Sequence, residues 1–157
     1  MTTNEIRFYL HNFHKLESEI QELTNSLKEC RLVNISGIKA QVITDMPLCH
    51  SNTSKTESQA CARIERIGNI MYELKLKKRL LDSINFIYFR LKDPKTTIFE
   101  LRYFVVPIGR PRYNWLEISK YVGESEDNCK KIDERIILKI QLNYIQNVTC
   151  VQKMSVI

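Results

Sequence analysis

Apolar residues recur at intervals of three and four along most of this chain, which is the period of an amphipathic α-helix. Near the amino terminus they form one continuous stripe over 4–30, with Thr3 or Asn4 as the expected helix cap. The members of the stripe are Ile6, Leu10, Phe13, Leu16, Ile20, Leu23, Leu27 and Cys30. Because this spacing approaches a heptad seam, the predicted helix either packs on the next helix or associates with a second copy of the chain.

A second stripe predicts another long helix over 57–91. Its members are Ala60, Ile64, Ile67, Met71, Leu74, Leu81, Ile84 and Leu91. Between the two helices, residues 33–56 are rich in polar and turn-forming residues and are predicted to form a long loop, which is usually functional or flexible. Ser54 and Glu57 have the spacing of a capping box for the second helix. The two helices are expected to form an antiparallel hairpin.

The segment 97–140 predicts three further helices. Asp93 ends the long helix, because a residue that precedes a proline disfavours helical torsions. The first helix of the segment has a bulky apolar core, made of Phe99, Leu101, Tyr103 and Phe104. The other two run over 115–122 and from Glu126 onward. Gly123 suits a helix end with positive φ, and the Ser125 hydroxyl can cap the last helix.

A short helix, a glycine-containing turn and a longer helix have the spacing of a helix-turn-helix motif. The apolar faces of the last two predicted helices support this interpretation. The stripe expected to be buried in the last helix is Cys129, Ile132, Ile136 and Ile140, and its counterpart in the preceding helix is Trp115, Ile118 and Val122. The opposite face carries Asp127, Lys131 and Glu134, flanked by Asn128, Lys130 and Arg135.

These patterns predict an all-α protein with a helical hairpin over 1–92, a helix-turn-helix domain over 93–146 and a tail over 147–157. The net charge of +6 favours a polyanionic partner. The charge is unevenly distributed, with −2 over 4–30 and +5 over 63–92, so the hairpin helices are complementary. The basic residues from Lys75 to Arg79 form either a solvated face or a contact with the DNA backbone.

The last two predicted helices resemble region four of bacterial sigma factors. The matching residues are Trp115-Leu116-Glu117-Ile118-Ser119, Val122-Gly123, Ser125, Cys129-Lys130-Lys131-Ile132 and Ile137-Leu138-Lys139-Ile140. The resemblance implies that the helix opened by Ser125 lies in the major groove of DNA.

The whole order of predicted elements is similar to that of the ArpU/RinA family, which are small phage or prophage transcriptional regulators of low-GC Gram-positive bacteria. The matching elements are an N-terminal helix, an Asp45-Met46-Pro47 loop with a serine-rich continuation, a long basic helix and the terminal module. Leu48-Cys49-His50 stands where the family's loop has glycines. The resemblance implies activation of phage or prophage genes through promoter DNA.

The candidate DNA-binding residues lie in the last helix and in the basic loop before it. They are Ser125, Glu126, Asp127, Asn128, Lys130, Lys131, Glu134 and Arg135 in the helix, and Arg110 and Arg112 in the loop. The Gly-Arg-Pro-Arg sequence of the loop resembles a minor-groove hook, and its arginines are expected to contact phosphate. The acids of the first helical turn favour the helix dipole and repel phosphate, but a carboxylate can also accept from cytosine.

Other functions are also compatible with this sequence. The mixed-charge face suits a protein-interaction module that binds RNA polymerase or another regulator, or a stand-alone sigma-like factor for a toxin operon. The sequence has no glycine-rich phosphate loop, HExxH or GxSxG motif, so no enzymatic activity or cofactor is expected. Asp127, Asp133 and Glu134 are interpreted as a solvated helix face.

The cysteines and histidines do not predict a metal site. The five cysteines, an odd number without a C-x-x-C pair, are Cys30, Cys49, Cys61, Cys129 and Cys150, and they are expected to be reduced thiols. His11 and His14 are expected to be exposed on one helix face. The sequence has neither a signal-peptide-like start nor an apolar run that could span a bilayer, which predicts a cytoplasmic protein without membrane contact.

Overall fold

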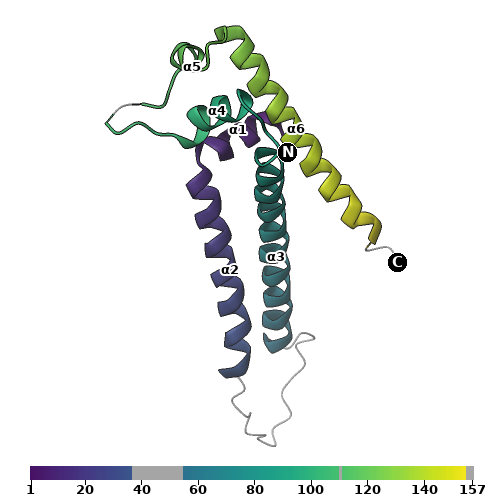
Figure 1. Ribbon diagram of the computed structural model, residues 1–157. Helices are drawn as coiled ribbons and strands as arrows, with labels where there is room; N and C mark the ends of the chain where they lie inside the picture. Colours follow the sequence, from purple (N-terminus) through teal and green to yellow (C-terminus); the bar gives the residue numbers. More distant parts are fainter. Residues whose placement is uncertain (37–54, 110, 155–157) are drawn as a thin grey trace, which may run out of the picture. The chain divides into compact units, whose positions relative to one another are not determined.

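The described part of the chain is helical and contains no strand, which confirms the all-α prediction (Figure 1). The computed structural model describes the backbone of residues 1–36, 55–109 and 111–154 and the side chains of 1–31, 58–109 and 111–147. The elements are α1 (Thr3–His11), α2 (Phe13–Ser36), α3 (Lys55–Tyr88), α4 (Lys95–Phe99), the π-helix η1 (Glu100–Phe104), α5 (Trp115–Val122) and α6 (Glu126–Met154). None of the described helices is long and apolar enough to cross a membrane.

The chain divides into two packing units. The first unit comprises Met1–Ser18 and Lys77–Ile157, and the second comprises Glu19–Leu76. The predicted boundary after residue 92 does not coincide with this division, because α1 packs with the C-terminal elements. In the first unit α6 contacts α1, α4 and α5 (Figure 1).

The prediction of one continuous first helix is wrong, because the helix is interrupted at Asn12 between α1 and α2. The Asn12 backbone amide and its side-chain Nδ2 both donate to the Phe8 carbonyl, at 3.0 and 2.8 Å. Such local side-chain bonds of Asn compete with helix continuation. The helix cap is also one residue earlier than expected: the Thr2 hydroxyl accepts from the Glu5 amide at 3.3 Å. The break separates Ile6 and Leu10 from the rest of the heptad stripe.

The other helix boundaries lie close to the predictions. The long basic helix predicted over 57–91 is α3, and α5 has the bounds predicted from the sequence. Residues 33–36 belong to α2 and 55–56 to α3, so these positions of the predicted loop are helical. The rest of that loop, including Ser54 of the predicted capping box, lies outside the described residues. Residues 147–154 of the predicted tail belong to α6, and the sequence there has no Gly or Pro to end the helix.

The core of the first unit contains apolar residues of α1, the start of α2, α3, α4, η1, α5 and α6. Its buried members include Ile6, Leu10, Leu16, Leu80, Ile84, Ile98, Phe99, Tyr103, Ile118, Cys129, Ile132, Ile136, Ile137, Ile140 and Tyr144. All four residues predicted for the buried face of α6 are buried, and Ile137 extends that face. Aromatic rings close the core near η1, where Phe99 lies edge-on to Phe104 and tilted against Tyr103.

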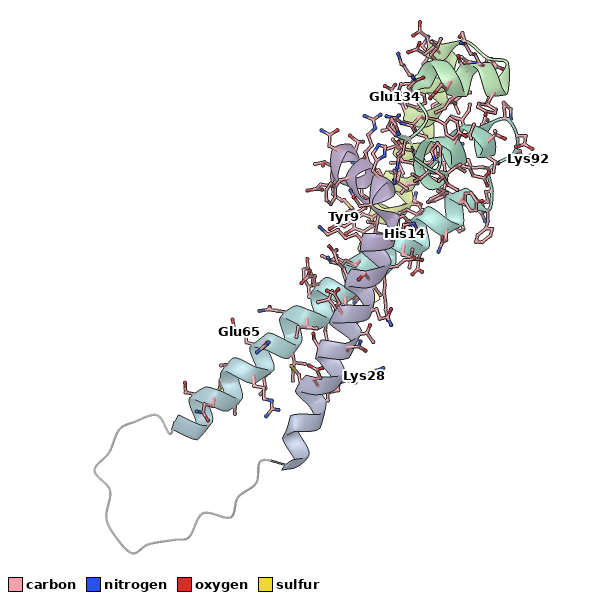
Figure 2. The ribbon with its side chains drawn as sticks, turned by 90° about the vertical axis from the view of Figure 1, so that its left-hand side faces the viewer. Tyr9, His14, Lys28, Glu65, Lys92 and Glu134 are labelled. Atoms are coloured by element: carbon pink, nitrogen blue, oxygen red, sulfur yellow. The ribbon has the colours of Figure 1, made fainter. Side chains whose placement is uncertain are left out.

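The second unit is much less well packed. Within it α2 contacts α3 through a hydrogen bond from the Arg63 guanidinium to the Cys30 carbonyl, at 3.1 Å. Among the described side chains of Glu19–Leu76 only Leu74 is buried. Figure 2 shows Glu65 on the side of α3 that faces away from α2. The apolar residues of this unit are therefore only partly covered within one chain.

We expect Ile140→Ala to lower the free energy of unfolding by about 2 to 5 kcal/mol, because Ile140 is fully buried and the truncation leaves a cavity. Leu138→Ala is the matched control on the same helix, since Leu138 is exposed, and it should change stability by less than about 1 kcal/mol. Urea denaturation followed by circular dichroism measures both. Equal losses for the two variants would contradict the assignment of the α6 core face.

Candidate nucleic-acid interface

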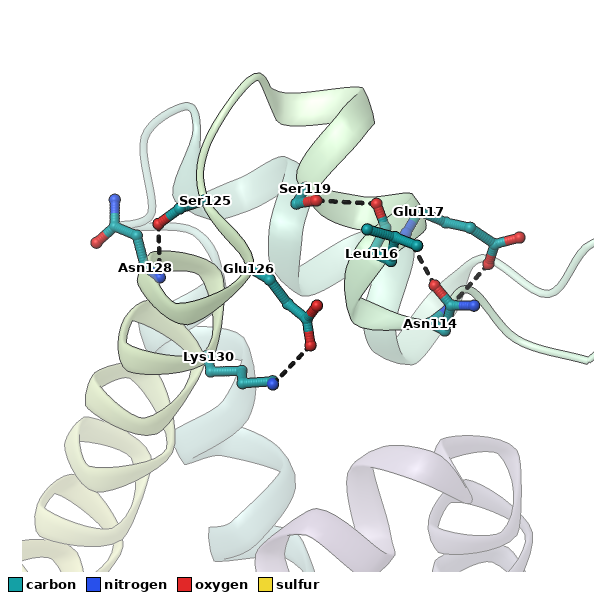
Figure 3. A network of polar contacts seen from close by, with 8 residues as sticks. All are labelled: Asn114, Leu116, Glu117, Ser119, Ser125, Glu126, Asn128 and Lys130. Atoms are coloured by element: carbon teal, nitrogen blue, oxygen red, sulfur yellow. Dashed lines mark hydrogen bonds and ion pairs between the residues drawn. The ribbon is translucent and has the colours of Figure 1, made fainter.

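Helix α5 is fixed at both ends by local hydrogen bonds. Asn114 and Glu117 form a capping box, in which the Asn114 side chain accepts from the Glu117 amide at 2.8 Å and the Glu117 carboxylate accepts from the Asn114 amide at 2.9 Å (Figure 3). At the other end Gly123 has φ 75°, and its amide donates to the Ser119 carbonyl at 2.9 Å. The prediction of a positive φ at Gly123 is confirmed. This conformation turns the chain sharply into α6.

Ser125 caps α6, as its position predicted. Its hydroxyl accepts from the Asn128 backbone amide at 3.3 Å (Figure 3). The Asn128 side chain donates to the Glu124 carboxylate at 2.7 Å. One turn further, the Lys130 ammonium lies 2.6 Å from the Glu126 carboxylate. The hydrogen bond to Glu126 raises the pKa of Lys130. The first turns of α6 are thus organised by bonds within the helix itself.

The outer face of α6 carries both signs of charge. Asp127, Lys131, Glu134 and Arg135 are exposed there, as is Ser125 at the cap. Asn128, Glu126 and Lys130 are half-buried. Eight of the ten predicted site residues therefore lie together at the start of this helix.

Asp133 contradicts the prediction of a solvated acidic face, because it is only 2 % exposed. The Tyr103 hydroxyl donates to its Oδ2 at 3.2 Å, and the Arg7 guanidinium lies 3.8 Å from the same atom. Burial raises the pKa of Asp133, and the Tyr103 hydrogen bond and the nearby Arg7 and Arg102 charges partly oppose this. The prediction failed because α1 and η1 cover a second side of α6, next to its apolar stripe.

Arg112 is held by α1. Its Nη2 donates to the His11 carbonyl at 2.6 Å, and its Nη1 lies 2.9 Å from the His11 ring Nδ1. Burial lowers the pKa of His11, and the neighbouring Arg102, Arg112 and Arg7 charges lower it further, so its neutral ring can accept from Arg112. His11 was expected to be exposed, and this is wrong; His14 is exposed as predicted.

The guanidinium of Arg112 is therefore occupied by bonds inside the first unit, which differs from the expected phosphate contact. Arg112 gives the last carbonyl group of α1 a hydrogen-bond donor, a common role for basic side chains at helix ends. The other arginine of the predicted hook, Arg110, lies outside the described residues.

A cleft of about 260 Å³ adjoins the start of α6. It is lined by Arg7, His11, Arg102, Tyr103, Trp115, Lys130, Asp133 and Glu134. The Arg102 guanidinium stacks 4.6 Å from the centre of the Trp115 ring and donates to the Tyr113 carbonyl at 3.3 Å. The sequence analysis missed Arg7 and Arg102, because no local signal places α1 and η1 beside α6. Both add positive charge next to the candidate interface.

The described residues do not include a group of three or more His, Cys, Asp or Glu side chains arranged to hold a metal ion. Of the cysteines in the described part, Cys30, Cys61 and Cys129 are all free thiols. Comparisons of the chain with models of protein families, with curated proteins and with solved structures find no match.

The raised pKa of Asp133 predicts a pH-dependent contribution to stability. Since its folded-state pKa lies above the ordinary value of 3.8, ionisation of Asp133 opposes folding, and this cost grows as the pH rises through 3.8 toward the folded value. We expect Asp133→Asn, which keeps an acceptor for Tyr103, to gain stability relative to the parent chain over this pH range. Urea denaturation at a series of pH values measures the difference.

Asp127→Asn removes the same formal charge from an exposed position of the same helix and serves as the control. Its stability difference from the parent should not follow the same trend. If the stability difference between Asp133→Asn and the parent does not change with pH, ionisation of the buried Asp133 carboxyl does not destabilise the fold.

We expect Arg112→Ala to lower the free energy of unfolding by about 1 to 3 kcal/mol, because the His11 carbonyl and ring lose their charged donor. Arg135→Ala, at an exposed position, is the matched control and should change stability by less than about 0.5 kcal/mol. Urea denaturation compares them. An Arg112→Ala variant as stable as the parent would contradict a structural role for Arg112 and would favour the original expectation that Arg112 contacts DNA phosphate.

Proposed function

We propose that this protein is a sequence-specific DNA-binding transcriptional regulator that places the start of α6 in the major groove, and that it activates phage or prophage genes. In this proposal residues from 93 onward act as a helix-turn-helix domain and the long N-terminal helices form a hairpin. The observation that carries the proposal is the outward-facing start of α6, set after α5 by the left-handed Gly123 and capped by Ser125.

The side chains on this face suit base and phosphate recognition. Lys131 and Arg135 are exposed cations one helical turn apart, and Arg or Lys can donate to the O6 and N7 atoms of guanine. Asn128 could pair with adenine, which would require its side-chain bond to Glu124 to open. Asp127 is exposed and can accept from the amino group of cytosine.

The charge balance of the face limits its non-specific affinity. Glu126 neutralises Lys130 through their ion pair, and Asp127 and Glu134 offset Lys131 and Arg135. Acids in the first turn stabilise the helix dipole but repel phosphate. The remaining attraction comes from the net charge of +6, to which Arg7 and Arg102 beside the interface contribute. Base contacts therefore carry a large share of the expected affinity.

We expect the full chain to enrich a distinct duplex from a random-sequence DNA library, and Lys131→Ala to weaken binding to that duplex by about tenfold. Fluorescence anisotropy with the labelled duplex measures the affinity. Lys139→Ala is the matched control, because Lys139 is exposed on the same helix about 12 Å further along its axis. It should keep the parent affinity.

A salt titration provides the second measurement. The logarithm of the binding constant should fall linearly with the logarithm of salt concentration, with a slope set by the number of phosphates neutralised. If Lys131 contacts phosphate, its loss reduces this slope by about one. Equal affinities and slopes for parent, Lys131→Ala and Lys139→Ala would mean that α6 is not the recognition helix.

A protein partner such as RNA polymerase or another regulator is the second candidate. It is favoured by Leu116 and Tyr121, two large apolar side chains that α5 leaves exposed beside the candidate interface. Failure of the library to yield any bound duplex would favour this function over DNA binding. Binding to a purified polymerase that Leu116→Ala weakens, with little dependence on salt, would support it.

A further inference from the structure

The second unit, Glu19–Leu76, leaves apolar side chains of α3 in solvent. Ile64 is 71 % exposed, Tyr72 66 % and Met71 47 %. Ordering each residue of such helices costs backbone entropy, which long helices offset mainly by burying an apolar face. A unit in which Leu74 is the one buried member among the described side chains lacks most of that compensation.

The helix α3 carries two separate faces in this unit. The inner face contains Ile67, Ile70 and Leu74, which are half-buried or buried. The outer face follows a heptad spacing of three and four, and all of its members are exposed: Cys61, Ile64, Gly68, Met71 and Lys75. At 100° per residue the centres of the two faces lie roughly 105° apart around the helix. Two apolar faces on one helix are typical of a bundle in which the helix has two neighbours.

Gly68 lies at the centre of the outer face. Apart from its own neighbours along the helix, a Cβ atom added there would meet no atom of the described residues within 4 Å. In the middle of a helix Gly is less favourable than Ala, and no contact with the described residues requires Gly at this position. A glycine surrounded by larger apolar residues lets another backbone approach closely.

We infer that the outer face of α3 is a homodimer interface, in which two copies of α3 cross in antiparallel orientation with Gly68 at the two-fold axis. The face is complementary to itself in this arrangement. Ile64 and Tyr72 lie four residues before and after Gly68, so Ile64 of one copy meets the partner's Tyr72, and the reverse contact follows from symmetry.

The charges select a second copy in the antiparallel orientation. A parallel pair would bring Lys75 against the partner's Lys75 within the seam, which is repulsive. The antiparallel pair places Lys75 opposite the partner's Cys61 and within one helical turn of the partner's Glu65. Glu65 is exposed on the same outer side of α3, away from α2 (Figure 2). This interface does not rest on what α6 binds.

Sedimentation equilibrium of the full chain tests the proposal without any DNA. We expect the parent to be a dimer at micromolar concentration and Ile64→Lys to be a monomer that keeps its helical circular dichroism. Asn69→Lys introduces the same charge at an exposed position on the other side of α3 and should remain a dimer. A monomeric parent, or a dimer that tolerates Ile64→Lys, overturns the interface.

Gly68→Gln gives opposite results for a single chain and for a dimer. In a single chain the new side chain enters open space and improves helix propensity, so the thermal midpoint should rise. In the dimer it obstructs the crossing, and we expect the dissociation constant to rise at least about tenfold. A higher thermal midpoint with an unchanged mass would contradict the crossing at Gly68.

Disulfide mapping tests the orientation. In a Lys75→Cys variant, Cys61 and the new thiol of the same chain are about 21 Å apart along the helix, so no bond can form between them. Mild oxidation should give a dimer in which peptide mass spectrometry finds a link between positions 61 and 75. A link between position 61 of both copies, or no link at either position, contradicts the antiparallel dimer.

Discussion

The apolar face of α6 is the constraint on which the first unit depends. Buried residues from Cys129 to Ile140 give α1, α4 and α5 a common surface, and α1 and α4 also contact η1. Because one side of α6 is committed to this core, its opposite side is left facing solvent. The exposure of the proposed recognition face is therefore a direct consequence of how the core is built.

Beside that apolar face, Asp133 connects three elements through one buried carboxylate. Tyr103 of η1 donates to it, Arg7 of α1 lies close to it, and its own backbone belongs to α6. The cost of burying the charge appears as the raised pKa of Asp133. Removing one partner of such a group is far more costly than removing an exposed charge. The same contacts bring Arg7 next to the start of α6, and its guanidinium adds positive charge to the proposed DNA-binding surface.

The two units differ in how they complete their cores. The first unit closes its core within one chain, with Phe99, Ile118 and Ile140 all fully or almost fully buried. The second unit leaves an apolar seam exposed around Gly68, and the inferred dimer would cover it. Such a dimer would supply two copies of the proposed recognition helix, and dimeric helix-turn-helix proteins in general bind paired half-sites on DNA. The proposed function and the inferred dimer remain separate claims, since each has its own measurement.

The sequence by itself determined the helices and their local ends. The period of apolar residues located α3, α5 and α6, while Gly123 and Ser125 marked the turn, because caps and helix periodicity are local properties. Only the tertiary structure decided the position of α1 beside α6. That packing buried Asp133, engaged Arg112 with His11 and placed Arg7 near the candidate interface. These contacts join residues about a hundred or more positions apart, and the spacing of residues along one helix carries no information about such distant neighbours.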